Sequence, residues 1–134
     1  MGETGEKGDA MILIDTNIFI DHLRDFKHAS VFFESLQRRD DVFFSAITEA
    51  ELIAGSENND PEKKKVLLRF LSQWHKIEVS NPIAILAGDL KREYNLLLPD
   101  AIIAATARHH NIEILTRNTK DFKKIKDLTV RSPY

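Results

Sequence analysis

The sequence of 134 residues contains no cysteine, and this absence excludes several kinds of chemistry at once. Without thiols there is no disulfide bond, no thiolate zinc site and no cysteine nucleophile. A metal ion would have to be bound by oxygen atoms or imidazole rings. A site in which carboxylates outnumber histidines favours magnesium or manganese.

Other familiar signatures are also missing. No apolar run approaches the roughly 20 residues of a membrane-spanning helix, and nothing resembles a signal peptide, so we expect a cytoplasmic protein. A glycine-rich phosphate loop and a Gly-x-Ser-x-Gly elbow are absent, which leaves nucleotide-binding and serine-hydrolase functions without support. The five histidines show no ligand spacing, and we interpret them as surface or helix-end residues: His22, His28, His75, His109 and His110.

What is present fits one domain with a substantial core, since 43% of the residues are hydrophobic and 30% are charged. We expect the folded domain to span residues 11–134. Residues 1–10 are rich in glycine and charge, and we predict that they are a disordered leader or an added extension. The net charge of −2 gives no general sign of polyanion binding. The segment 117–131, however, holds six basic residues against two acidic ones, which suits either a nucleic-acid-binding flank or a solvated lysine-rich face.

Short apolar runs alternate with helix-like segments along the chain. We expect strands at 11–14, 42–44, 76–79, 113–115 and 128–130. Helices are expected at 17–23, 29–36, 48–54, 99–109 and 121–124, and two more begin at Pro61 and Pro82. The alternation predicts an α/β domain built around a mostly parallel central sheet.

Acidic or amide residues directly follow strands or lie in the first turns of helices at several places. Such residues meet at the carboxyl edge of a parallel sheet, where open α/β folds build their sites. Converging carboxylates repel one another unless a cation lies between them. The pattern therefore predicts a divalent-metal site and an enzyme that uses it, with these candidate residues: Asp15, Glu51, Asp100, Asn118 and Asp121.

Each candidate also has a purely structural interpretation. Asp15 could simply cap the helix that follows it, and Glu51 completes a formal capping box with Thr48. Asn118 and Asp121 could be ordinary loop residues. Asp100 is the most telling candidate, because it begins an apolar helix and a carboxylate in such surroundings is costly unless it is paired or bound to a metal.

Four motifs, taken in order, closely resemble those of the PIN-domain family, and within it the VapC-type toxin ribonucleases of type II toxin–antitoxin systems. The motifs are Ile14-Asp15-Thr16-Asn17, Thr48-x-x-Glu51-Leu52-x-x-Gly55, Pro99-Asp100-Ala101-x-Ile103-Ala104-Ala105-x-Ala107 and Leu115-Thr116-x-Asn118-x-x-Asp121-Phe122. The resemblance spans nearly the whole chain from Met11 onward.

The resemblance implies a PIN-like α/β/α sandwich that cuts RNA with the help of Mg²⁺ or Mn²⁺. By position, Asp15 and Asp100 would bind the metal directly, and Glu51 would act through water. Family members carry an acid or amide at the position of Asn118 and often another acid at that of Asp121, so either residue could fill the fourth site position. Two threonines look like supporting hydroxyl groups: Thr16 and Thr116.

The resemblance also implies a homodimer and a small antitoxin protein that covers the acidic cleft, often with a basic side chain. Candidates to hold the RNA backbone are Arg117, Lys120, Lys123 and Lys124. Three alternatives stay open: a PIN-like RNA-processing nuclease without an antitoxin, a non-catalytic PIN-like binding module, and a phosphoacceptor receiver domain. The receiver domain is disfavoured because Asp15 has no acidic neighbour in its strand.

Overall fold

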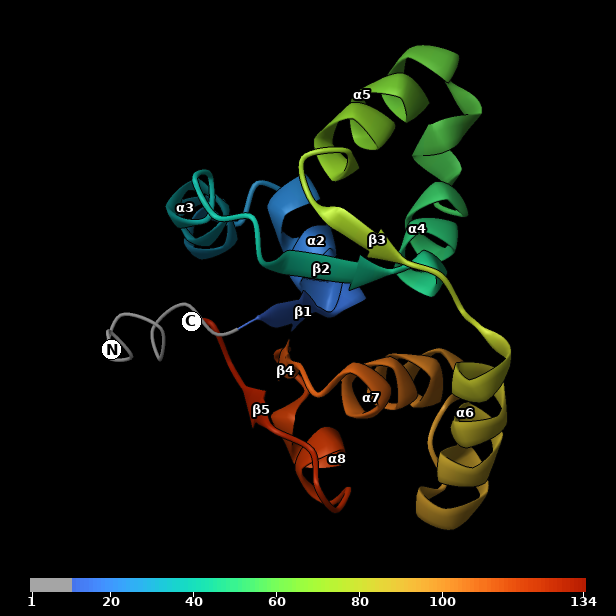
Figure 1. The fold of residues 1–134 in the computed structure, drawn as a ribbon. Helices are drawn as coiled ribbons and strands as arrows, with labels where there is room; N and C mark the ends of the chain where they lie inside the picture. The colour runs from blue at the N-terminus through green and yellow to red at the C-terminus, as the bar shows by residue number, and fades with distance from the viewer. Residues whose placement is uncertain (1–10) are drawn as a thin grey trace.

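Five parallel strands form one sheet at the centre of the molecule (Figure 1). The computed structural model describes residues 11–134, so the predicted leader at 1–10 lies outside the described residues. In chain order the strands are β1 (Ile12–Ile14), β2 (Val42–Ser45), β3 (His75–Ile77), β4 (Glu113–Leu115) and β5 (Val130–Arg131). Their order across the sheet is β3-β2-β1-β4-β5. The chain thus builds outward from β1 to β3 and then crosses back, which creates a topological switch point between β1 and β4.

The central strand β1 is covered on both faces. Ile12 and Ile14 pack into one hydrophobic cluster, whereas Leu13 packs into a second cluster on the opposite face. All three side chains are essentially buried. This double burial explains why the strand is a continuous apolar run rather than an alternating one.

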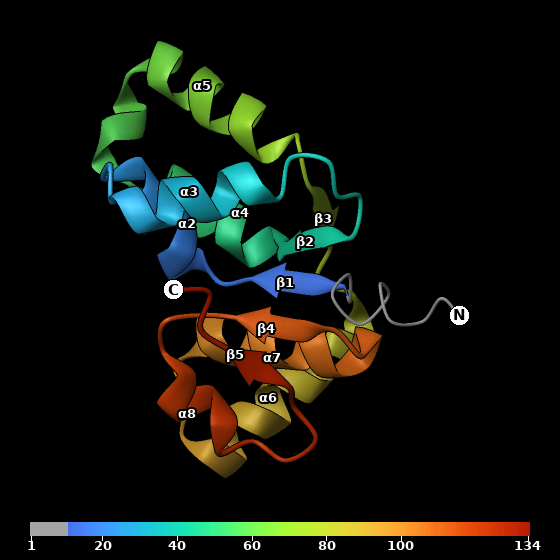
Figure 2. The same cartoon turned by 90° about the vertical axis from the view of Figure 1, so that its left-hand side faces the viewer.

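Helices cover the two faces in separate groups. One cluster joins the sheet to α2 (Thr16–Leu23), α3 (Lys27–Ser35), α4 (Ala46–Ile53) and α5 (Pro61–Leu71), with a 3₁₀ turn, η1 (Ser56–Asn59), between the last two. The other cluster joins it to α6 (Asn81–Tyr94), α7 (Leu98–His110) and α8 (Thr119–Lys123). Figures 1 and 2 show the same division, which confirms the predicted α/β/α arrangement. Within residues 11–134, no helix has the length and apolar character needed to cross a membrane.

Several element boundaries differ from the expected ones. The helix expected at 48–54 begins at Ala46, because Ser45 caps it by accepting a hydrogen bond of 3.1 Å from the backbone N–H of Ile47. The strand expected at 76–79 is displaced to His75–Ile77, and the last strand lies at Val130–Arg131 rather than at 128–130. The fold is unaffected because these elements lie at the two outer edges of the sheet or at a helix end.

Candidate active site at the carboxyl edge of the sheet

Asp15 lies at the switch point, directly after β1, where it caps α2. Its Oδ1 accepts a hydrogen bond of 2.8 Å from the backbone N–H of Thr16, and its Oδ2 accepts one of 2.6 Å from the hydroxyl of Thr116. The side chain is only 4% exposed. Burial raises the pKa of Asp15 to about 6 against the lowering effect of the Thr116 hydrogen bond, and the charges of Asp100 and Glu51 raise it further. Asp15 is therefore both a cap and a buried carboxylate in an acidic cluster.

Glu51 reaches the same region from α4. The hydroxyl of Thr16 donates a hydrogen bond of 2.7 Å to Glu51 Oε1 and lies 2.9 Å from the hydroxyl of Thr48. The predicted capping box of Thr48 and Glu51 is therefore wrong: Ser45 is the cap of α4, and Thr48 lies inside the helix with a fully buried side chain. Glu51 is exposed, so its side chain is accessible from solvent.

Asp100 occupies the first turn of α7, and six residues of that helix are buried: Ala101, Ile103, Ala104, Ala105, Thr106 and Ala107. Its pKa is raised first by partial burial and then by the charges of Glu51 and Asp121. Asp121 comes from the first turn of α8. Four of the candidate acids are thus linked electrostatically: Asp100 and Glu51 act on Asp15, and Glu51 and Asp121 act on Asp100.

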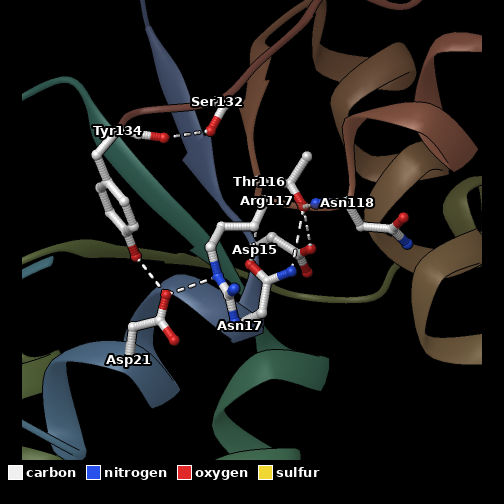
Figure 3. Close-up of polar contacts among 8 residues, drawn as sticks. All are labelled: Asp15, Asn17, Asp21, Thr116, Arg117, Asn118, Ser132 and Tyr134. Atoms are coloured by element: carbon white, nitrogen blue, oxygen red, sulfur yellow. Dashed lines mark hydrogen bonds and ion pairs between the residues drawn. The ribbon is translucent and has the colours of Figure 1, made fainter. Parts of the chain in front are cut away.

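Asn118 contributes its backbone rather than its side chain to this cluster. Its N–H donates a hydrogen bond of 2.9 Å to the hydroxyl of Thr116, which fixes the oxygen that contacts Asp15. Figure 3 shows the side-chain amide of Asn118 directed away from the carboxylate of Asp15. Of the two residues expected to share the fourth position, Asp121 is the one whose charge acts on Asp100.

Three polar residues that the sequence analysis did not assign to the site border it as well (Figure 3). Asn17 donates a hydrogen bond of 3.4 Å to the Thr116 hydroxyl and accepts one of 3.5 Å from the backbone N–H of Arg117. Asp21 forms an ion pair of 2.7 Å with Arg117 and accepts a hydrogen bond of 2.6 Å from the Tyr134 hydroxyl. No local signal could have found Asp21 or Tyr134, because their contact joins residues 113 positions apart.

The residues present fit a hard divalent cation. Within residues 11–134, none of the four clustered acids forms an ion pair with a lysine, arginine or histidine. Nor do three or more acidic or histidine side chains in that range lie close enough together to hold a metal. A hard divalent cation can be bound by one or two carboxylates and keep several waters. Among the four, Asp15 is buried, Asp100 and Asp121 are partly buried, and Glu51 is exposed.

The histidines take no part in this donor set. His22, His109 and His110 occupy the last turns of helices, and His28 and His75 are exposed. Their interpretation as surface or helix-end residues is confirmed.

Comparisons with known proteins agree with the fold. The family model of the PIN domain matches residues 12–128. Ribonuclease VapC19 of Mycobacterium tuberculosis is 32% identical, and the match covers 92% of this chain and all of the relative. A toxin–antitoxin complex from Klebsiella pneumoniae contains a chain with a TM-score of 0.77 and 37% identity, covering 92% of this chain and 98% of that one.

A second solved structure, VapBC2 from Rickettsia felis bound to a DNA fragment from its promoter, matches with a TM-score of 0.77 and 26% identity. That match covers 91% of this chain and 98% of the other. The family match spans nearly all of the described residues, and the matched relatives are of similar length. The chain belongs to the PIN-domain family of nucleases.

Proposed function

We propose that this protein is a magnesium- or manganese-dependent endoribonuclease and the toxin of a toxin–antitoxin pair. One observation carries the proposal: at the carboxyl edge of the sheet Asp15, Glu51, Asp100 and Asp121 act on one another in pairs through their charges, and no cationic side chain among residues 11–134 forms an ion pair with any of them. An outside cation is needed to relieve their repulsion. PIN-domain ribonucleases generally depend on divalent metal ions, and the relatives' names point to RNA as the substrate.

The chemistry that a bound Mg²⁺ or Mn²⁺ supplies is polarisation of a phosphoryl oxygen and a lower pKa for water. Asp15 and Asp100 would hold such an ion, and the Thr116 hydroxyl keeps the Asp15 carboxylate in one orientation. Glu51, oriented by Thr16, takes the proton of the attacking water. As the new phosphorus–oxygen bond forms, the bond to the leaving ribose oxygen breaks, and that oxygen takes up a proton from solvent.

A groove beside Glu51 suits the expected antitoxin. It has a volume of about 600 Å³ and runs between α2, α4 and α5, with apolar walls that include Leu23, Leu52 and Val66. Leu23 and Val66 are 45% and 61% exposed, and they lie together in the lining of this one groove. An apolar segment of a small antitoxin would cover this groove, and a basic side chain at its end would reach Glu51. We also propose that the toxin and its antitoxin act in the cytoplasm. The homodimer that the resemblance implies stays a prediction, which a molar mass from light scattering would test.

Cleavage of a mixed RNA pool tests the proposal. The wild type is incubated with Mg²⁺ or Mn²⁺, with EDTA, and in parallel with Asp100→Asn and Glu113→Gln. Glu113 is the matched control, because it is a carboxylate at the opposite edge of the sheet that is already paired with Arg131. We expect metal-dependent cutting by the wild type and by Glu113→Gln, and none by Asp100→Asn or with EDTA. A folded wild type that cuts nothing with either metal would refute the proposal and favour a non-catalytic binding module.

A further inference from the structure

Arg117 is held in one position beside the acidic cluster. Its Nε pairs with Asp21 Oδ2 at 2.7 Å, and its backbone N–H contacts Asn17. The residue directly before it, Thr116, donates its hydroxyl to Asp15. Figure 3 shows the Arg117 side chain lying over the start of α2 with its guanidinium group turned toward Asp21.

Tyr134 secures the carboxylate that holds Arg117. Its hydroxyl donates a hydrogen bond of 2.6 Å to the same Oδ2 atom of Asp21. The tyrosine ring packs against Phe26 and Phe32, with ring centroids 5.7 and 6.4 Å away. Burial and the neighbouring Asp21 carboxylate raise the pKa of the Tyr134 hydroxyl above its ordinary value, so the group stays a hydrogen-bond donor at physiological pH. Asp21 is thereby fixed from two sides.

Most of the guanidinium group remains available after these contacts. Arginine has five N–H donors, and only the one on Nε is used by Asp21. The side chain of Arg117 is 53% exposed, whereas that of Asp21 is only 13% exposed. The nearby basic residues of the predicted RNA-binding flank are different: Lys120, Lys123 and Lys124 are exposed and form no hydrogen bond or ion pair within the described residues.

We propose that Arg117 binds a phosphate of the RNA next to the cleaved bond, and that Asp21 and Tyr134 are positioning residues that hold its guanidinium group for this contact. The proposal rests on the proposed ribonuclease function. A phosphate that approaches four carboxylates needs a fixed positive charge besides the metal ion. The planar fork of arginine meets two phosphate oxygens at once, which a mobile lysine cannot do.

A purely structural role for the ion pair makes a different prediction. A half-exposed arginine–carboxylate pair contributes only about 0–1 kcal/mol to stability. If the pair merely fastened residues 132–134 to α2, its loss would change stability slightly and leave substrate binding unchanged. KM therefore distinguishes the two roles: it rises on loss of Arg117 only if the arginine binds RNA. The melting temperature changes little in either case.

The experiment measures kcat, KM and the melting temperature with one RNA that the wild type cuts. The variants are Arg117→Gln, Arg117→Lys and Tyr134→Phe. The matched control is Arg108→Gln, which removes an arginine paired with Asp127 at the far end of α7 from Asp100. KM is measured at several salt concentrations, because each lost phosphate contact reduces the slope of log affinity against log salt by about one.

We expect Arg117→Gln to raise KM about tenfold and to reduce the salt slope by about one, at an unchanged melting temperature. Arg117→Lys should keep the positive charge but recover only part of the affinity for RNA. Tyr134→Phe should raise KM by roughly threefold, because it frees Asp21 and so loosens Arg117 without removing its charge. A KM for Arg117→Gln equal to that of Arg108→Gln would overturn the proposal. A wild type that cuts no RNA would instead refute the ribonuclease function itself, so the two failures are distinguishable.

Discussion

Acidic residues lie at both edges of the central sheet, and their partners differ. At the amino edge three acids are paired with arginines: Asp41 with Arg39 at 2.8 Å, Glu113 with Arg131 at 3.3 Å and Asp127 with Arg108 at 3.7 Å. At the carboxyl edge the four clustered acids, Asp15, Glu51, Asp100 and Asp121, have no such partner within residues 11–134. Burial together with mutual repulsion raises the pKa of two of them: Asp15 and Asp100.

The comparison separates structural acids from functional ones. A carboxylate that already has an arginine gains little from a metal ion, whereas carboxylates that repel one another without a cationic partner are stabilised when a cation binds between them. The direction of the strands explains the location, because strand ends and helix starts gather only at the carboxyl edge. Four predictions test the difference, from the largest expected effect to the smallest.

Metal binding should distinguish the two edges most strongly. Asp15→Asn removes a direct ligand, and we expect it to weaken Mn²⁺ binding by more than about 100-fold, since even outer partners of metal ligands are worth about 10–100-fold. Glu113→Gln should bind Mn²⁺ as the wild type does. Titration calorimetry on both variants measures this. Equal affinities in Asp15→Asn and the wild type would rule out Asp15 as a ligand.

The stability of the metal-free protein should show the cost of the unpaired carboxylate. The pKa of Asp15 in the folded protein is raised to about 6, so the folded state binds its proton more tightly than the unfolded chain does. The free energy of unfolding of the wild type therefore falls as the pH rises from about 4 to about 6, and it stays low above that range. A rise of about two pKa units corresponds to about 3 kcal/mol.

Asp15→Asn should recover that loss. We expect the variant to unfold with up to about 3 kcal/mol more free energy than the wild type at about pH 8, and with no difference at about pH 3.5. Denaturant titrations in EDTA at the two pH values measure it. A variant that is destabilised equally at both pH values would show that the Asp15 carboxylate is not strained by burial.

The hydroxyl behind Asp15 should have an intermediate effect. Thr116→Val keeps the shape of the side chain but removes the donor to Asp15 Oδ2 and the acceptor for Asn118 N–H. We expect about tenfold weaker metal-dependent cleavage, at the lower end of the range for such supporting contacts. Ser132→Ala serves as the comparison, because among residues 11–134 the hydroxyl that it removes donates a hydrogen bond only to the backbone oxygen of Tyr134. Equal rates in the two variants would count against the role of Thr116.

The paired acids of the amino edge should have the smallest effect. Glu113→Gln breaks a half-exposed ion pair, and we expect it to change the free energy of unfolding by less than about 1 kcal/mol at neutral pH. The same denaturant titration measures it. A loss of several kcal/mol would mean that the amino-edge pairs are as important to the fold as the core, and the comparison between the edges would fail.

Much of this arrangement was predictable from local sequence. The apolar run before Asp15 and the alanine-rich helix after Asp100 indicated a buried strand and a buried helix, because their residues leave no polar face. The capping box at Thr48 and Glu51 was wrong for an equally local reason: Ser45 lies three residues earlier and caps the helix first, which frees Thr48 to contact Thr16. Where a helix begins therefore depends on which of several neighbouring polar residues caps its free backbone N–H groups.

The sequence by itself determined the alternation of strands and helices, the burial of β1 and α7, and which acids follow strands or begin helices, because these depend on periodicity and on residues a few positions apart. Only the tertiary structure decided which acids are paired. Asp121 and Asp127 lie six residues apart in the same basic segment, yet one acts on Asp100 and the other pairs with Arg108. The contact of Tyr134 with Asp21 likewise depends on two distant ends of the described chain meeting in space, since a hydrogen bond is decided by atomic position and not by sequence separation.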